Sequence, residues 1–385
     1  MTPAELVDDE LKREQVAITS LQNGTLSYFD SERRLQQERV QAFVQLDAIG
    51  GRSASLSPGE AVVELTDGQR FVGEWRGGAS GGASGGESLR WEHPTLGTMT
   101  LPLDRLRAVR FRTLDGWDAE PIAHGPTPAQ DTVTLVNGDE LRGFVLEMTD
   151  DAVVLQPDGG DEPWSLPHAR IAMLRLANPD EPPATGHQVM VLGDGSRAHV
   201  TGLAISREQV QFASGLRDDG ERGEMGLDDL VGVDFTAHGR RLVPLVDQPM
   251  TVIEGGEVFG LPTPPRTVGK RLRLQAPIVV QFELPESAQR FAAVAELALD
   301  GDAPAHLPDW ADFEVIVQQG DHEQRYRLHG SQREVSINLA LDDATLRLEL
   351  DPGVNGPILD RLQLRDAVLL IHEPTDPSPA SDAGL

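Results

Sequence analysis

The stretch Thr132–Ala177 reads TVTLVNGDELRGFVLEMTDDAVVLQPDGGDEPWSLPHARIAMLRLA and predicts a compact group of five short strands. Its first strand runs into Asn137-Gly138, a dipeptide that strongly signals a β-hairpin. Further apolar segments follow, separated by turns rich in Asp and Gly. So many short strands in so few residues are typical of one small barrel or of half a sandwich.

The same pattern recurs elsewhere in the chain. Each copy has an apolar strand, an Asn-Gly or Asp-Gly turn, a second strand and a closing apolar-x-x-apolar-x-Phe/Leu segment. The turn glycines Gly24, Gly68, Gly138 and Gly195 are unevenly spaced, which indicates irregular duplication instead of a tight solenoid. We therefore expect full repeats over residues 60–115, 131–177 and 187–240, and a partial repeat over residues 15–52.

The two ends of the chain depart from this pattern. Residues 1–14 are polar and charged, and we expect a short helix over Ala4–Arg13 or no fixed structure there. Residues 373–385 are expected to form a disordered tail.

Residues 250–372 have a different character, with longer strands after a predicted linker at Glu254–Arg266. Eight strands with long loops and no clear helical stretch predict a jelly-roll sandwich. We expect these strands at Arg271–Leu274, Ile278–Leu284, Phe291–Ala298, Phe313–Gln318, Gln324–Leu328, Glu334–Leu339, Ala344–Leu350 and Ala367–Ile371. The predicted fold is therefore all-β: tandem small five-stranded barrels followed by a C-terminal jelly-roll β-sandwich.

The composition of the chain excludes several classes of partner and of chemistry. Its 385 residues carry a formal net charge of −29, which repels nucleic acid and anionic membrane surfaces. The chain has no cysteine, so disulfides and thiolate chemistry are excluded. We see no apolar run of membrane-spanning length, and no secretory leader within Met1–Gln15. We expect no nucleic-acid partner, no membrane insertion, and a periplasmic or extracellular location.

The repeat region, about residues 61–235, resembles the Sm-like family of small five-stranded barrels. The resemblance is carried by the turn and by a glycine five residues after it, Gly73 after Gly68 and Gly143 after Gly138. The third full copy has Val200 at that place. The resemblance implies RNA binding through basic and aromatic loops. However, residues 131–177 contain nine acidic residues against three arginines, which is the wrong balance for RNA.

The C-terminal region, about Gly255–His372, resembles the novel putative carbohydrate-binding module, a galactose-binding-like jelly roll. The resemblance is carried by Gly269–Leu274, Gln289–Ala298, Phe313–Val317 and Leu346–Leu370, with Leu364 where the family has an aromatic residue. It implies a jelly-roll fold and a carbohydrate ligand.

An exposed aromatic face with planar polar partners is what a sugar site needs. Trp310 is the aromatic residue that we nominate, with His306, Asp309 and Asp312 beside it in the sequence. The alternative is that Trp310 plugs the end of the sandwich. The other tryptophans of the strands, Trp75, Trp91 and Trp164, are expected in the core or at an interface.

Motifs for catalysis and for metal binding are weak. Gly-x-Ser-x-Gly occurs at Ser80 and Ser84, but only inside the low-complexity loop Gly77–Gly86, which lacks the strand and helix of a nucleophile elbow. Asp300-Gly301-Asp302 is interpreted as an acidic turn in preference to a calcium loop. We predict no catalytic residues, no metal and no cofactor.

These observations favour a non-catalytic binding protein of the bacterial envelope or exterior. Its barrels would act as spacer or protein-interaction modules, and its jelly roll would recognise a ligand such as carbohydrate. The alternative is an assembly subunit whose β domains contact partner proteins without binding sugar. A third hypothesis is an enzyme of glycan processing.

Overall fold

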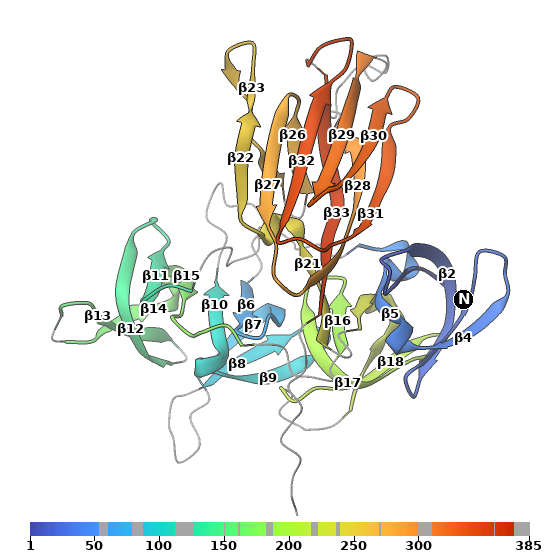
Figure 1. Ribbon diagram of the computed structural model, residues 1–385. Helices are drawn as coiled ribbons and strands as arrows, with labels where there is room; N and C mark the ends of the chain where they lie inside the picture. The colour runs from blue at the N-terminus through green and yellow to red at the C-terminus, as the bar shows by residue number, and fades with distance from the viewer. Residues whose placement is uncertain are drawn as a thin grey trace, which may run out of the picture. The chain divides into compact units, whose positions relative to one another are not determined.

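The computed structural model is all-β and divides into two compact units (Figure 1). Unit 1 contains Met1–Asp8 and Arg13–Ala237, and unit 2 contains Asp9–Lys12 and His238–Leu385. The structure describes residues 1–53, 61–78, 88–111, 127–149, 151–160, 162–181, 188–216, 222–235, 239–268, 271–298, 310–357 and 359–372.

Unit 1 consists of four modules of five antiparallel strands each. In every module the fifth strand pairs with the first, and the first four pair in chain order, which gives the order 5-1-2-3-4. The first module contains β1 (Thr2–Asp8), β2 (Arg13–Gln22), β3 (Thr25–Phe29), β4 (Leu35–Arg39) and β5 (Phe43–Asp47). The second contains β6 (Ala61–Leu65), β7 (Arg70–Gly78), β8 (Ser88–His93), β9 (Gly97–Pro102) and β10 (Leu106–Arg110).

The remaining two modules repeat this arrangement. The third contains β11 (Asp131–Leu135), β12 (Glu140–Met148), β13 (Ala152–Pro157), β14 (Trp164–Pro167) and β15 (Ile171–Arg175). The fourth contains β16 (Gln188–Leu192), β17 (Arg197–Ile205), β18 (Gln209–Ala213), β19 (Gly223–Gly226) and β20 (Leu230–Asp234). A single 3-10 turn connects the fourth strand to the fifth in each module: η1 (Val40–Ala42), η3 (Leu103–Arg105), η4 (His168–Arg170) and η5 (Leu227–Asp229).

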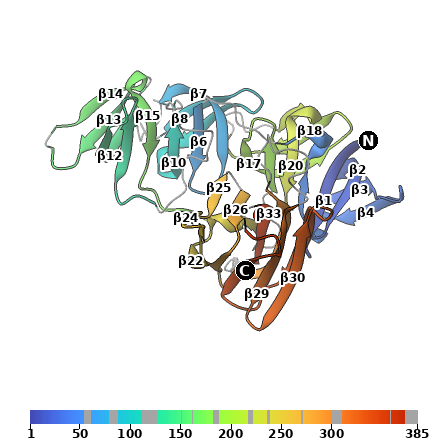
Figure 2. The ribbon, with the colours of Figure 1, turned by 90° about the horizontal axis from the view of Figure 1, so that it is seen from above.

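The modules are joined side by side through their strands. β10 pairs with β15, β20 pairs with β5, and β17 pairs with both β7 and β2. Figure 2 accordingly shows the modules in the order third, second, fourth and first. One continuous cluster of buried apolar side chains runs through all four modules, so they share a core instead of hanging as separate beads.

The predicted hairpin turns are confirmed, in two geometries. Asn23 and Gly24 form a two-residue loop, both with positive φ, between the paired residues Gln22 and Thr25. At the Asn137-Gly138 turn the loop has three residues, because the Leu135 N–H donates to the Asp139 carbonyl (2.8 Å). The turns at Gly68 and Gly195 have the same hydrogen bonds as the one at Gly138.

The glycine five residues after the turn has a packing role. A Cβ on Gly73 would lie 2.3 Å from the Glu92 carbonyl oxygen, and one on Gly143 would lie 2.1 Å from the Gln156 carbonyl oxygen. The second and third strands therefore approach closely at this point, which only glycine permits.

The expectation for the first residues of unit 1 was wrong. Residues 2–8 form β1 instead of a helix, because Ala4 and Leu6 alternate into the core and are 2% and 3% exposed. Trp164 is 49% exposed on β14, in contrast to Trp91, which is fully buried. Trp75 is half-buried and stacks on His168 of the third module, with 3.5 Å between ring centroids.

Unit 2 is a sandwich of two antiparallel sheets. One sheet has the order β25-β26-β33-β28-β31, with β21 also paired to β33, and the other has the order β22-β27-β32-β29-β30. The eight predicted strands are all present: β26 (Arg271–Gln275), β27 (Ile278–Glu283), β28 (Ala288–Leu297), β29 (Asp312–Gln319), β30 (His322–His329), β31 (Glu334–Ala340), β32 (Thr345–Pro352) and β33 (Arg361–His372). Their inward-facing apolar side chains form a second core.

Five strands at the start of unit 2 were not predicted. They are β21 (Arg240–Pro244), β22 (Met250–Gly255), β23 (Glu257–Val258), β24 (Leu261–Pro262) and β25 (Arg266–Val268). The segment Glu254–Arg266 is thus a hairpin with flanking strand residues instead of a linker. β21 pairs with β33 and is followed by the fully buried Leu245, so unit 2 begins ahead of residue 250.

Candidate functional site

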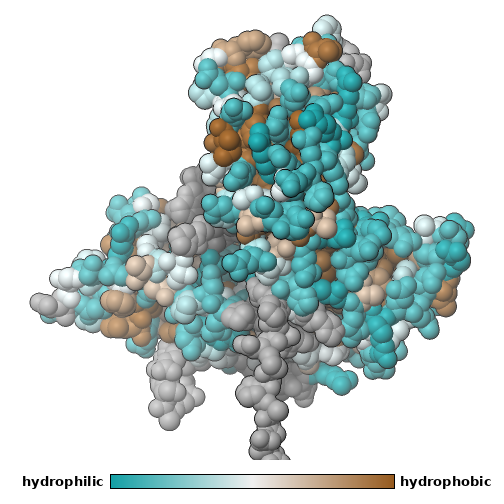
Figure 3. Space-filling model, in the orientation of Figure 1, coloured by the Kyte–Doolittle hydropathy of each residue, from teal (hydrophilic) through white to brown (hydrophobic). Residues whose placement is uncertain are grey.

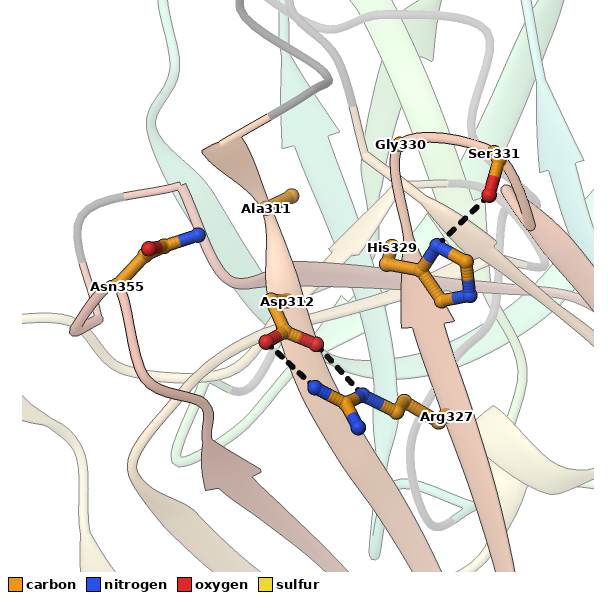
Figure 4. Close-up of a pocket in the computed structure, with 7 residues that line it drawn as sticks. All are labelled: Ala311, Asp312, Arg327, His329, Gly330, Ser331 and Asn355. Atoms are coloured by element: carbon orange, nitrogen blue, oxygen red, sulfur yellow. Dashed lines mark hydrogen bonds and ion pairs between the residues drawn. The ribbon is translucent and has the colours of Figure 1, made fainter.

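A pocket of about 560 Å³ opens at one end of the sandwich (Figure 4). It lies where β29 begins, where β30 ends and where the loop after β32 passes. Its lining is mostly polar: Ala311, Asp312, Arg327, His329, Gly330, Ser331 and Asn355.

Asp312 and Arg327 form a bidentate ion pair in this pocket. Arg327 Nε donates to Asp312 Oδ1 (2.7 Å) and Arg327 Nη2 donates to Asp312 Oδ2 (2.8 Å). On the paired strands β29 and β30, Asp312 lies opposite His329 and Glu314 lies opposite Arg327. Asp312 and Arg327 are therefore diagonal neighbours on the two strands. The Arg327 guanidinium lowers the pKa of the Asp312 carboxyl.

Contacts from Asp360 and from the loop after β32 hold the backbone of Asp312 in position. Its N–H donates to Oδ1 of Asp360 (3.0 Å), a residue with no exposed surface. A Cβ on Gly353 would lie 1.8 Å from the Asp312 carbonyl oxygen, so the loop after β32 packs directly against this residue. Burial raises the pKa of Asp360. These contacts hold the Asp312 carboxylate in place at the pocket.

The other polar groups come from separate segments. Ser331 Oγ lies 3.0 Å from His329 Nδ1, which orients the imidazole at the end of β30. Asn355 Nδ2 donates to the Trp310 carbonyl oxygen (3.1 Å), and Figure 4 shows Asn355 on the opposite side of Asp312 from His329. The pocket thus presents a carboxylate, a guanidinium, an imidazole and an amide, which can bind a ligand with several hydroxyl groups.

The sequence-predicted residues have different outcomes. Trp310 directly precedes the pocket residue Ala311, and 62% of its surface is exposed, so it does not plug the sandwich. His306 and Asp309 lie outside the described residues. Arg327, His329 and Asn355 were not predicted, because each belongs to a different segment from Trp310. The pairing of β29 with β30 brings Arg327 and His329 to the pocket, and the loop after β32 brings Asn355.

Unit 1 holds a cluster of Ser, His and Asp in which His93 and Ser196 are buried and Asp194 is half-buried. His93 Nε2 lies 2.9 Å from Ser196 Oγ and 3.1 Å from Asp194 Oδ2. The backbone N–H groups of Thr95 and Leu96 both donate to His93 Nδ1, so Nδ1 carries no hydrogen and Nε2 is the donor. A nucleophilic triad needs the acid and the serine on opposite ring nitrogens. This cluster instead fastens the second module to the fourth.

Three predicted features of the sequence lie largely beyond the described residues. Of the Gly-rich loop Gly77–Gly86, the structure describes only Gly77 and Gly78, at the end of β7. Ser80, Ser84 and the turn Asp300-Gly301-Asp302 are outside the described ranges. Within the ranges that are described, no group of three or more His, Asp and Glu side chains is placed to hold a metal ion. In the same ranges, none of the helices has the length and apolar character needed to cross a membrane.

No family model and no curated protein matches this chain. Among solved structures, a similar one is CBM51 from Clostridium perfringens GH95 in complex with methyl-galactose, with 14% identity and a TM-score of 0.22 over 26% of this chain and 68% of that one. A second contains CBM51-2 in complex with GlcNAc and INT domains from Clostridium perfringens ZmpB, with 12% identity and a TM-score of 0.26 over 44% of this chain and 37% of that one.

A third similar structure is exo-beta-1,3-galactanase from Phanerochaete chrysosporium with galactose, with 10% identity and a TM-score of 0.18 over 91% of this chain and 68% of that one. At TM-scores this low, the likenesses carry no argument about function.

Proposed function

We propose that the sandwich unit binds carbohydrate at the Asp312 pocket and that the protein is non-catalytic. The observation that carries this proposal is the sequence Trp310-Ala311-Asp312, in which an exposed indole lies two residues before the ion-paired carboxylate of the pocket.

A sugar ring has an apolar face and a rim of hydroxyl groups. An exposed indole offers a flat surface for the apolar face, and its π-system attracts C–H groups. The Asp312 carboxylate accepts hydrogen bonds from hydroxyl groups, while the Arg327 guanidinium donates to them. Because the ion pair is already formed, both groups are oriented before the ligand arrives, which limits the entropy lost on binding.

The test is a glycan array with the full chain, run with and without calcium. We expect saturable binding to a limited set of glycans, and loss of that binding in Trp310→Ala. A blank array with folded protein would contradict the proposal. Binding that survives both Trp310→Ala and Arg327→Gln would place any sugar site elsewhere.

The second candidate function is that of an assembly subunit. It is favoured by exposed apolar side chains on the edge strand β22 and the hairpin after it, and the face of the sandwich in Figure 3 carries apolar patches. These side chains are Met250, Val252, Ile253, Phe259 and Leu261. A stable oligomer in light scattering that Phe259→Ser dissociates would support this function.

A further inference from the structure

The four modules of unit 1 are joined by two kinds of contact, which alternate along the row in Figure 2. The third module contacts the second through their fifth strands, β15 and β10, and the fourth contacts the first through their fifth strands, β20 and β5. Between these two pairs, the second module contacts the fourth through their second strands, β7 and β17. If the alternation continued beyond the third module, the next contact would be made by its second strand, β12.

The contact between β7 and β17 is two-fold symmetric. In each module, the side chain of the residue after the turn glycine accepts a hydrogen bond from a backbone N–H of the other module. Ser196 Oγ accepts from the Val72 N–H (2.9 Å), and Gln69 Oε1 accepts from the His199 N–H (2.8 Å). Each donor lies three residues after the acceptor of its own module. A contact in which both sides use the same patch is the type that joins two identical chains into a closed dimer.

The first half of β12 has one side without a partner strand. This half pairs with β11, and the pairing with β13 begins only at Gly143. On the β13 side the Arg142 carbonyl accepts a hydrogen bond from the Asp158 N–H (3.0 Å). Among the residues that the structure describes, β12 pairs with no strand of another module, whereas β2, β7 and β17 each pair with the second strand of a neighbouring module.

The turn before β12 is exposed, although its counterparts are buried. Gln69 and Ser196, which follow the turn glycines of the second and fourth modules, are 3% and 0% exposed. Asp139 has the same place in the third module and is exposed, and 70% of the Arg142 side chain is exposed. The hydrogen bonds between the second and fourth modules explain the burial of their two turns. A partner of the same kind would cover the third.

Exposed apolar side chains lie beside this turn. Phe144 follows Arg142 by two residues and therefore lies on the same face of β12, and it is 55% exposed. Val136, just before the turn, is 43% exposed, whereas Thr66 at the same place in the second module is 3% exposed. Figure 3 shows apolar side chains gathered on the surface of the third module. Neighbouring exposed apolar residues favour a protein partner over water.

We propose that β12 binds β12 of a second copy of this chain, in the antiparallel register of β7 with β17, and that the protein is a two-fold dimer. In that register the two copies of Glu140 lie opposite each other, as Arg70 and Arg197 do in the internal contact. Arg142 of each copy then lies beside Asp139 of the other copy, so an ion pair forms at each end of the contact.

The other end of the row explains why the association stops at two chains. The second strand of the first module, β2, already pairs with β17 inside the chain, with Leu21 opposite Ile205. A contact that uses the same patch on both chains closes as a dimer and does not continue as a filament. The net charge of −29 opposes association, but charges beyond a Debye length of about 8 Å are screened at physiological ionic strength.

The test is sedimentation velocity of the full chain at physiological ionic strength over a series of concentrations. We expect a monomer–dimer equilibrium in the parent protein. Arg142→Glu places two acids together across the contact, and Asp139→Arg places two arginines together, so each variant alone should be monomeric. Mixed in equal amounts, the two variants should form a heterodimer, because every pair across the contact then has opposite charges.

Arg207→Glu is the matched control, because it makes the same charge change at an exposed turn of the fourth module and should leave the dimer unchanged. A parent that is monomeric at every concentration would overturn the proposal. So would a dimer that survives both β12 variants, or two folded monomeric variants whose mixture stays monomeric. A dimer that Phe259→Ser dissociates and Arg142→Glu does not would assign the contact to unit 2 instead. Trp310→Ala should leave the dimer intact, so this result is independent of the sugar proposal.

Discussion

The Arg327 guanidinium and the Asp312 carboxylate meet through two parallel hydrogen bonds, although their residues are diagonal neighbours on different strands. Two residues earlier on β30, Arg325 contacts Glu314 (3.3 Å) and Glu323 (2.6 Å) without a bidentate geometry. The two arginines therefore offer a comparison between a site residue and an ordinary surface residue.

Arg327→Gln is expected to lower the urea midpoint of unit 2 more than Arg325→Gln does. The reason is that Asp312 is 7% exposed and loses two charged hydrogen bonds, whereas Glu314 and Glu323 remain hydrated. Urea titrations of the two variants, followed by circular dichroism, measure this difference. Equal midpoints for the two variants would refute it.

Trp310→Ala is expected to weaken glycan binding at least about tenfold, the loss for one stacked aromatic contact. The melting temperature should not change, because 62% of the Trp310 surface is exposed. Trp164→Ala is the control, since Trp164 is also exposed, at 49%, but belongs to unit 1. If both variants bind glycan as the parent does, the indole has no part in recognition.

Gly143→Ala is expected to destabilise unit 1 by about 1–3 kcal/mol, the usual cost of forcing an extra carbon into a packed site. The new Cβ would lie 2.1 Å from the Gln156 carbonyl oxygen. At Gly226, in contrast, a Cβ would meet nothing closer than 3.6 Å, so Gly226→Ala should be nearly neutral. Chemical denaturation of the two variants tests the close approach of β12 and β13.

Asp67 should make unit 1 sensitive to acid. Burial favours its neutral form, but hydrogen bonds from His199 and from Gln69 outweigh burial and lower the pKa of Asp67 to about 2. This pKa is below the unfolded value, so the stabilisation is complete above about pH 4 and is lost as the pH falls toward 2, a change of about 2 kcal/mol.

Comparing the parent with Asp67→Asn at pH 7 and at pH 2.5 checks this expectation. The difference in the free energy of unfolding between the two proteins should shrink at the lower pH, because the parent has by then lost most of the advantage of the ionised carboxylate. A difference that stays constant across this range would show that Asp67 does not titrate as described.

The sequence predicted the elements of the fold that a local pattern of residues determines. The turns at Gly24, Gly68 and Gly138 and the eight long strands of the sandwich follow from dipeptide geometry and from apolar alternation. The strands β23 and β24 escaped prediction because each has two residues, too few to show a period. β1 was missed because its charged neighbours obscured the alternation of Ala4 and Leu6.

The site was predictable only in part, for a different reason. Trp310 and Asp312 stand together in the sequence, so local reasoning could find them. Arg327 and Asn355 reach the same pocket through strand pairing and through the loop after β32, and neither has a local signal.

The pairing of β5 with β20 has a consequence for the newly made chain. Leu46 lies opposite Val233, and the Phe235 N–H donates to the Val44 carbonyl, so the first module finds its neighbour only when nearly all of unit 1 has been synthesised. Until β20 has been synthesised, the edge of β5 that pairs with it has no partner strand. Contacts between such distant segments slow folding and expose unpaired strands to other nascent chains. During the time between the emergence of β5 and that of β20, the edge of β5 is therefore available to pair with a strand of another chain.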